Sequence, residues 1–168
     1  KYGYEVEGAD MRITLLRCAT YPNPNGDKGK HSFTYALYAH EGDARNSEST
    51  SQSFFLNNPV ILVKAGDKGD CKEEFSLLAA DAANIVADTV KKAENGRGFI
   101  VRLYESANKF TRAKIAFGVP VRRAAETDLT ERETNGISLS GENTVALEFR
   151  PFEIKTIFFE TEKSGNAS

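Results

Sequence analysis

Apolar residues alternate with other residues in short runs along most of this chain. The runs at 11–17 (MRITLLR), 31–41 (HSFTYALYAHE) and 111–119 (TRAKIAFGV) show this most clearly. A repeat of two residues places side chains on one face of a β-strand, whereas a helix requires a repeat near 3.6. The pattern therefore predicts antiparallel β-structure in which each strand buries one face.

The second half of the chain gives the strongest hairpin signal. Asn95-Gly96 separates two strand-like runs within residues 84–106, and Asn-Gly favours the tight turn that joins paired strands. Residues 80–94 would also suit a helix on propensity alone. We prefer the strand because the turn and its alternating partner follow at once. Seven or more short strands, with turn signals every eight to twelve residues, predict an all-β, antiparallel β-sandwich.

Changes in composition along the sequence predict four consecutive segments: two β-sandwich portions, a linker between them and a tail. Residues 1–64 are read as terminal strands of a larger, central β-sandwich, because they lack enough partners to bury their own faces. Residues 65–74 (AGDKGDCKEE) are predicted to form a charged linker. Residues 75–162 are predicted to form a small, immunoglobulin-like terminal β-sandwich, and residues 163–168 a disordered tail.

Within the first part, two stretches are less regular than the strands around them. Residues 42–53 are polar and rich in turn-forming residues, and are expected to form a surface loop. Pro59 should end or edge a strand, with another strand after it. Residues 120–133 are predicted to form a polar strand that lies at a sheet edge or has one solvent-exposed face.

Charge and composition exclude two classes of partner. Lys and Arg total 22 and Asp and Glu total 24, so the net charge of −2 argues against a nucleic-acid surface. No apolar run approaches the ~20 residues that span a bilayer. Cys18 and Cys71 lack metal-type spacing, and two reduced thiols in a cytoplasmic protein are favoured over a disulfide. The abrupt start at Lys1, without Met, suggests a domain excised from a longer protein.

The residues offer few candidates for chemistry. His31 and His40 lie nine apart on one predicted strand, so they face opposite sides, and solvent-facing histidines are favoured over metal ligands. Glu126 and Asp128 could act as an acid/base pair, but a solvated face opposite arginines is the commoner arrangement. No Gly-x-Ser-x-Gly elbow is present.

Exposed aromatic residues could form a sugar-binding platform, although half-buried strand tyrosines are commoner. The candidates are Tyr2, Tyr4, Tyr35, Tyr38 and Tyr104. Residue chemistry by itself therefore predicts a β-sandwich without a self-contained active site.

Three stretches resemble the C-terminal β-domain region of glycoside hydrolase family 38 α-mannosidases. The first is residues 1–43, with its Lys-Tyr-Gly start, a strand ending Leu-Leu-Arg, a proline-bearing loop and His-Ser-Phe-Thr-Tyr-Ala-Leu. The second is ENGRGFIVRLYES at 94–106. The third joins ETDLTERE at 126–133 to VALEFRPFEIKTIFF at 145–159. Several motifs in the family's order are more specific than any one of them.

The resemblance implies a non-catalytic portion of a longer enzyme. In such enzymes an N-terminal α/β domain carries a carboxylate nucleophile and a zinc ion bound by His and Asp, and no catalytic or zinc-binding motif of the family matches here. The implied reaction is retaining hydrolysis of terminal α-mannosides. Lys1, Tyr2 and Tyr4 would lie nearest the sugar, and Arg150 would hydrogen-bond across the sandwich edge.

The implied partners are the N-terminal catalytic domain of the same polypeptide and mannosides. A second copy of the chain is a further expected partner, because uncovered strands expose apolar surface. An independent carbohydrate-binding β-sandwich is the alternative. An immunoglobulin-like adhesion domain is disfavoured because Trp is absent.

Overall fold

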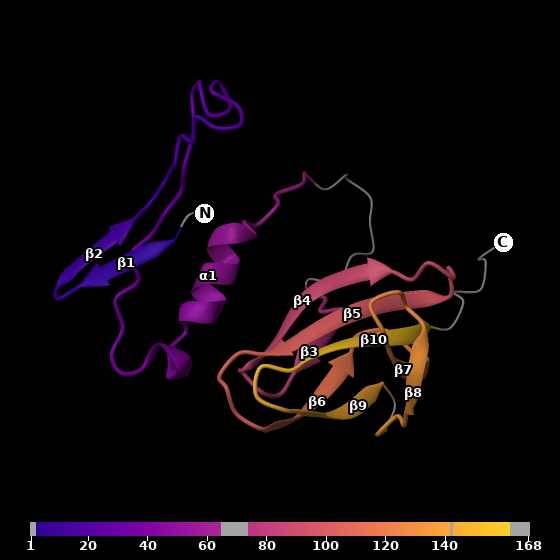
Figure 1. Ribbon diagram of the computed structural model, residues 1–168. Coiled ribbons are helices and arrows are strands. Elements are labelled where there is room, and N and C mark those ends of the chain that lie inside the picture. Colours follow the sequence, from indigo (N-terminus) through magenta and orange to yellow (C-terminus); the bar gives the residue numbers. More distant parts are fainter. Residues whose placement is uncertain (1–2, 65–73, 142, 162–168) are drawn as a thin grey trace. The chain divides into compact units, whose positions relative to one another are not determined.

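A computed structural model describes residues 3–64, 74–141 and 143–161 (Figure 1). The chain divides into two compact units, residues 1–39 and 40–168. The predicted linker at 65–74, apart from Glu74, and the predicted tail at 163–168 lie outside the described residues. Those two boundaries therefore stay predictions.

The first unit contains one hairpin. Strand β1 (Tyr4–Glu7) pairs antiparallel with β2 (Asp10–Ile13) around Gly8, whose φ of +61° suits a residue without a Cβ. The strand predicted over 31–41 is not formed. A strand exists only as part of a hydrogen-bonded ladder, and no described residue forms a ladder with this segment.

The second unit begins with helix where a loop was predicted, so that prediction is wrong. A 3₁₀ turn, η1 (Ala44–Asn46), leads to helix α1 (Ser49–Asn57). Asp43 Oδ1 accepts the Arg45 N–H at 2.8 Å, and Ser47 Oγ accepts the Ser49 N–H at 3.1 Å. Asp43 thus caps the 3₁₀ turn, and Ser47 binds the first residue of α1, so polar residues read as breakers stabilise this segment instead. The strand predicted after Pro59 is likewise not formed.

The rest of the second unit is a sandwich of two antiparallel sheets (Figure 1). Among the described residues, the larger sheet has the order β4-β5-β10-β7-β8, with β4 (Ile85–Lys92), β5 (Gly98–Glu105), β10 (Ile154–Thr161), β7 (Val121–Thr127) and β8 (Glu133–Ile137). The smaller has the order β3-β6-β9, with β3 (Leu78–Ala80), β6 (Thr111–Phe117) and β9 (Thr144–Phe149). The predicted fold class is confirmed.

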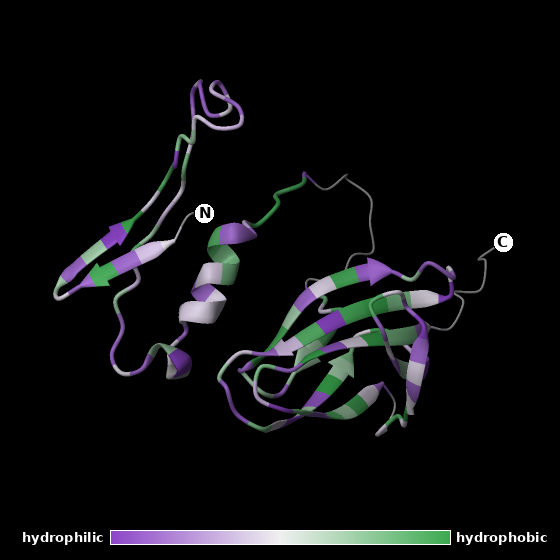
Figure 2. Cartoon of the chain, in the orientation of Figure 1, coloured by the Kyte–Doolittle hydropathy of each residue, from purple (hydrophilic) through white to green (hydrophobic). Residues whose placement is uncertain are grey.

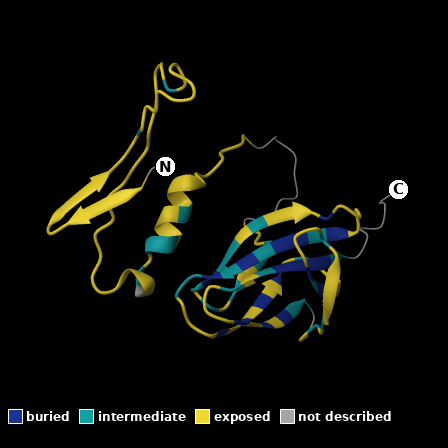
Figure 3. Cartoon of the chain, in the orientation of Figure 1, coloured by how far each residue is buried: buried dark blue, intermediate teal, exposed yellow. Residues whose placement is uncertain are grey.

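The hydrophobic core lies between these two sheets. Strand β6 alternates buried and exposed residues throughout, as the sequence predicted. Phe117 on β6 packs against Phe159 on β10, with their ring centroids 4.1 Å apart. Figure 2 shows apolar residues in these strands, and Figure 3 shows that the buried ones gather in the sandwich. Burial of apolar area is the main force that holds such layers together.

Strand pairing confirms one prediction and corrects another. The hairpin of β4 and β5 turns at Asn95-Gly96, where the Gly96 N–H donates to the Ala93 carbonyl at 2.9 Å. The polar strand predicted at a sheet edge or with one solvent-exposed face is β7, and the edge alternative is wrong because β7 pairs with both β10 and β8. It can lie there because Ala124 and Ala125 are buried between arginines and Glu126.

Candidate functional site

The predicted sugar-facing turn lies at the start of the chain. Lys1 and Tyr2 lie outside the described residues. Tyr4 begins β1 and is 72% exposed, and it shares one face of the hairpin with Val6 and Met11. This face is apolar and uncovered, so packing is an alternative to sugar contact, and the substrate role of Tyr4 stays a prediction.

The opposite face of the hairpin is charged. Arg12 forms exposed ion pairs with Glu5, Glu7 and Asp10 at 3.3–3.4 Å. Each of these carboxylates therefore has a cationic neighbour, which suits a solvated face.

The two histidines make separate, local contacts. The His31 Nε2 lies 2.9 Å from the Asp27 carbonyl oxygen, and its ring stacks on Phe33. The His40 Nδ1 lies 3.2 Å from the Glu41 carbonyl oxygen. Within residues 3–64, 74–141 and 143–161, no three His, Cys, Asp or Glu side chains group so as to hold a metal ion. No helix in these ranges is long and apolar enough to cross a membrane.

The tyrosines proposed as a platform are divided between the two units. Tyr4, Tyr35 and Tyr38 belong to the first unit, and Tyr104 lies on β5 of the sandwich. Burial raises the pKa of Tyr104, and the nearby Asp88 carboxylate raises it further. The sandwich thus contributes a single member of the predicted set.

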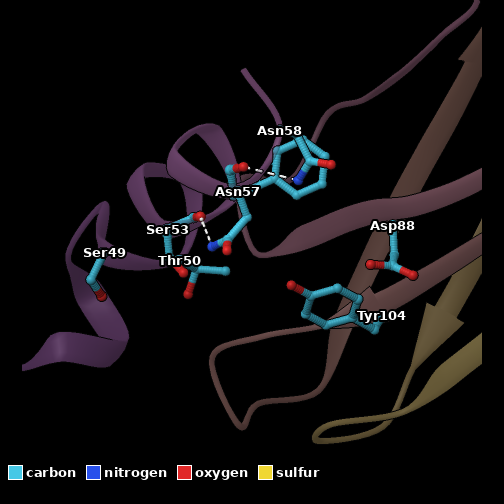
Figure 4. A pocket seen from close by; sticks show the side chains of 8 residues that line it. Ser49, Thr50, Ser53, Asn57, Asn58, Asp88 and Tyr104 are labelled. Atoms are coloured by element: carbon cyan, nitrogen blue, oxygen red, sulfur yellow. Dashed lines mark hydrogen bonds between the residues drawn. The ribbon is translucent and has the colours of Figure 1, made fainter. Parts of the chain in front are cut away.

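Tyr104 and Asp88 line an open hollow together with residues of α1 (Figure 4). The amides there already have partners, because Asn57 Nδ2 donates to the Ser53 carbonyl and Asn58 Nδ2 to the Phe54 carbonyl. Asp88 accepts the Thr89 hydroxyl at 2.8 Å. The lining is nonetheless mainly polar, because the hydroxyls of Ser49, Thr50, Ser53 and Tyr104 lie beside these groups.

Glu126 and Asp128 do not form an acid/base pair. Glu126 accepts from Lys155 Nζ at 3.0 Å, whereas Asp128 accepts from the backbone of its own turn, at Thr130 N and Arg132 N. The hydroxyl of Thr130, followed by these backbone donors, lowers the pKa of Asp128. Glu126 is held by a lysine on the neighbouring strand, rather than by the arginines that the sequence suggested.

The most strongly organised polar group in the sandwich is the carboxylate of Glu105, at the end of β5. Its residue is only 1% exposed. Oε1 accepts from Asn84 Nδ2 and the Ala107 N–H, both at 2.7 Å. Oε2 accepts from the Phe152 N–H at 2.9 Å and the Lys109 N–H at 3.2 Å. We call these five residues the Glu105 cluster.

Burial alone would raise the pKa of Glu105. The hydrogen bonds from Phe152, Asn84, Ala107 and Lys109 act in the opposite sense and leave the pKa below its ordinary value. A carboxylate that accepts several N–H groups is stabilised in its ionised form. The cluster therefore joins three connections, before β4, after β5 and between β9 and β10, around one buried negative charge.

The turn between β9 and β10 has an unusual backbone. Phe152 has a φ of +57°, a region that bulky side chains rarely adopt, and its N–H donates into the Glu105 cluster. Arg150 donates to Glu153 Oε1 through Nε and Nη2, at 3.2 and 2.9 Å. The predicted bond of Arg150 across the sandwich edge is therefore wrong, because this arginine pairs with a carboxylate three residues away.

A second charged group lies nearby on β10. Lys155 Nζ contacts Glu126 at 3.0 Å and Glu153 at 3.6 Å, and lies 6.0 Å from the centroid of the Phe149 ring. All three charged side chains are at least two-thirds buried. These ion pairs link β7 to β10 and to the turn that precedes β10.

Sequence reasoning did not single out Glu105, although a signal was present. Val101, Leu103 and Glu105 share one parity on a strand whose inward face is apolar. A carboxylate at an inward position must have partners, because burying an unpaired charge is costly. The residue belongs to RLYES, and its partner Phe152 to RPFEIK, so two of the family-like stretches meet in this cluster.

This arrangement is structural in its chemistry. Glu105 is closed to solvent, and donors from the chain occupy both of its oxygens. A nucleophile or general acid must instead reach its substrate. The sandwich residues that carry the resemblance hold the domain together, and they leave no carboxylate of the Glu105 cluster open for catalysis.

Comparison with known proteins gives a family match for the sandwich. Residues 84–157 match the model of the glycosyl hydrolases family 38 C-terminal beta sandwich domain. This range begins at Asn84 and ends on β10, so it includes every member of the Glu105 cluster.

Relatives extend the similarity to nearly the whole chain. Alpha-mannosidase G of Dictyostelium discoideum is 31% identical over 164 residues, which is 95% of this chain and 15% of that protein. Alpha-mannosidase 2C1 of Homo sapiens is 30% identical over 161 residues, 94% of this chain and 15% of that protein. An alpha-mannosidase of Saccharomyces cerevisiae is 25% identical over 175 residues, 92% and 16% respectively. The chain thus spans about 15% of the length of these relatives.

Proposed function

We propose that this chain is the non-catalytic C-terminal portion of a retaining α-mannosidase. Its C-terminal β-sandwich belongs to glycoside hydrolase family 38. One observation carries the proposal. The similarity covers 94–95% of this chain, yet only 15% of the Dictyostelium and human α-mannosidases. A segment of that size, matching a domain described as C-terminal, fits an accessory part of a longer enzyme.

The organisation of the sandwich supports an accessory role. Its most buried carboxylate, Glu105, joins three connections by hydrogen bonds. Lys155 is held between Glu126 and Glu153. We propose that the chain braces the catalytic domain and shapes the rim of the sugar cleft, with Lys1, Tyr2 and Tyr4 nearest the substrate.

Retaining hydrolysis requires a carboxylate nucleophile and a second carboxylic acid that serves in turn as acid and base. We propose that both, together with the zinc ion and its His and Asp ligands, belong to an N-terminal α/β domain. The zinc ion would supply Lewis-acid binding of the sugar in that domain. Within its described residues, this chain has no group of three ligands that fits a metal ion.

Two assays test the proposal together. The complete polypeptide, supplied with Zn²⁺, should hydrolyse a chromogenic α-mannoside, and this chain at equal molar concentration should not. Turnover by this chain alone would contradict the non-catalytic role. Absence of turnover by the complete polypeptide would contradict the α-mannosidase assignment. Removing these 168 residues should lower the melting temperature of the remaining enzyme, which tests the bracing role.

Direct sugar binding by this chain is a separate question. The exposed rings of Tyr4 and Tyr35 lie in the first unit, where an independent carbohydrate-binding module would use them. Calorimetric titration of this chain with mannose and manno-oligosaccharides decides between the two functions. Saturable binding by the chain alone would favour the module over the accessory role.

A further inference from the structure

Residues 60–63 form an apolar run that the described structure leaves uncovered. The four side chains, Val60, Ile61, Leu62 and Val63, are between 83% and 92% exposed. They follow α1 and Pro59 and belong to neither a helix nor a strand. Consecutive exposed apolar side chains mark a surface that another structure covers.

The composition of this run indicates a strand rather than a helix. Three of its residues are β-branched, and such side chains suit a pleated sheet. Pro59, just before the run, lacks an N–H and commonly stands at the first residue of a strand.

The run lacks the alternation seen elsewhere in this chain. In residues 32–35, Ser32 and Thr34 alternate with Phe33 and Tyr35, which is typical of a strand with one wet face. No polar residue interrupts 60–63, so both faces are apolar. A continuous apolar run is typical of a strand that is buried on both faces.

The sandwich of residues 78–161 already has its own core. Its core cluster runs from Ile85 to Phe159 and contains no residue of 60–63. Furthermore, none of the side chains whose burial the structure describes within residues 3–64 is buried. The α-mannosidase relatives are more than six times longer than the segment matched here, so a polypeptide of that length has ample further chain to supply the covering layers.

We propose that residues 60–63 are an interior strand of a β-sheet that the preceding part of the same polypeptide completes, with an apolar layer against each face. This inference rests on the proposed function, because it takes this chain to be one portion of a longer enzyme. The partner it fits is an open strand edge whose neighbours carry apolar side chains on both faces. Backbone hydrogen bonds would hold the strand, and its side chains would enter two separate cores.

Hydrogen exchange followed by mass spectrometry tests the pairing. In the complete polypeptide, the amides of residues 60–63 should exchange on the order of 100-fold more slowly than in this 168-residue chain. Equal, rapid exchange in both proteins would overturn the proposal. Slow exchange in this chain alone, at concentrations where it sediments as a dimer, would overturn the choice of partner in favour of a second copy.

Charge substitution tests whether both faces are covered. In a strand, the side chains of Ile61 and Leu62 point to opposite faces. Ile61→Asp and Leu62→Asp should therefore each lower the melting temperature of the complete polypeptide, by about 2 °C or more. Thr34→Asp, on the polar side of the alternating run, is the matched control and should change it little. An effect confined to one of the two positions would mean one wet face and would overturn the proposal.

These outcomes are distinguishable from failure of the proposed function. α-Mannosidase activity is measured on the same unmodified polypeptide as hydrogen exchange. Rapid exchange at 60–63 with full activity overturns the strand assignment alone. Slow exchange without activity overturns the proposed function and leaves the strand in place. If a charged variant does not fold, exchange in the unmodified protein still decides.

Discussion

The buried carboxylate of Glu105 accepts the backbone N–H of Phe152 at 2.9 Å. The two residues stand 47 positions apart in the sequence, at the end of β5 and in the turn between β9 and β10. Phe152 has a φ of +57°, so the chain holds a bulky residue in an uncommon conformation where its N–H meets this charge. Glu105 thus fixes both a connection and a backbone geometry.

Replacing Glu105 by glutamine should destabilise the sandwich strongly. Glutamine keeps the shape of the side chain but presents an NH₂ group to donors, leaving buried N–H groups without an acceptor. We expect the free energy of unfolding to fall by about 3 kcal/mol, measured by denaturant unfolding of this chain.

Glu148→Gln is the control. Glu148 pairs with Arg112 at the surface, and its loss should cost no more than about 0.5 kcal/mol. Equal effects of the two substitutions would contradict the structural role of Glu105.

The Glu105 carboxylate should also make stability depend on pH. Its pKa is lower in the folded chain than the ordinary value of 4.5, so folding favours the ionised form. This contribution is complete above pH 4.5 and is lost as pH falls through the folded pKa. As pH falls below 4.5, the free energy of unfolding should fall more steeply in the unmodified chain than in Glu105→Gln. Parallel curves would show that Glu105 does not titrate in this way.

Gly98 should not tolerate a side chain. A Cβ at this position would lie 1.7 Å from the carbonyl oxygen of Phe159, on the adjacent strand β10. Neither backbone can move without breaking the ladder, so we expect Gly98→Ala to cost about 3 kcal/mol. Gly136→Ala, on edge strand β8, is the control because nothing lies within 4 Å of the added Cβ. Comparison of their melting temperatures checks the prediction, and similar values would contradict it.

The accuracy of the sequence predictions depended on whether each element is stabilised locally or by distant partners. The β4–β5 hairpin was predictable because Asn95-Gly96 and both strands lie within one short stretch. Strand β6 was predictable because its alternation is matched by its burial. Helix α1 was missed because its serines were read as loop residues, although Ser47 ends the 3₁₀ turn before it by donating to the Ala44 carbonyl.

The polar contacts were harder to predict than the strands. Arg150 was expected to reach across the sandwich, but Glu153 is close enough in the turn to bind it. The partners of Glu105 come from three connections, and strand periodicity carries no information on how loops converge. Periodicity does place Glu105 on the inward face of β5, so its burial could have been inferred from the sequence. The N–H groups that donate to its carboxylate could not have been identified in that way.

The predicted role of Tyr4 near the sugar can be tested in the complete polypeptide. Tyr4 is 72% exposed in this chain, so its ring is not needed for the described hairpin. If the ring contacts substrate, Tyr4→Ala should raise KM about tenfold, equivalent to roughly 1.4 kcal/mol of lost binding, without changing the melting temperature. Tyr21→Ala is the control, because Tyr21 is 89% exposed and lies outside the predicted turn. The uncovered face that Tyr4 shares with Val6 and Met11 gives the opposing outcome. A lower melting temperature with unchanged KM would make Tyr4 a packing residue and remove it from the sugar site.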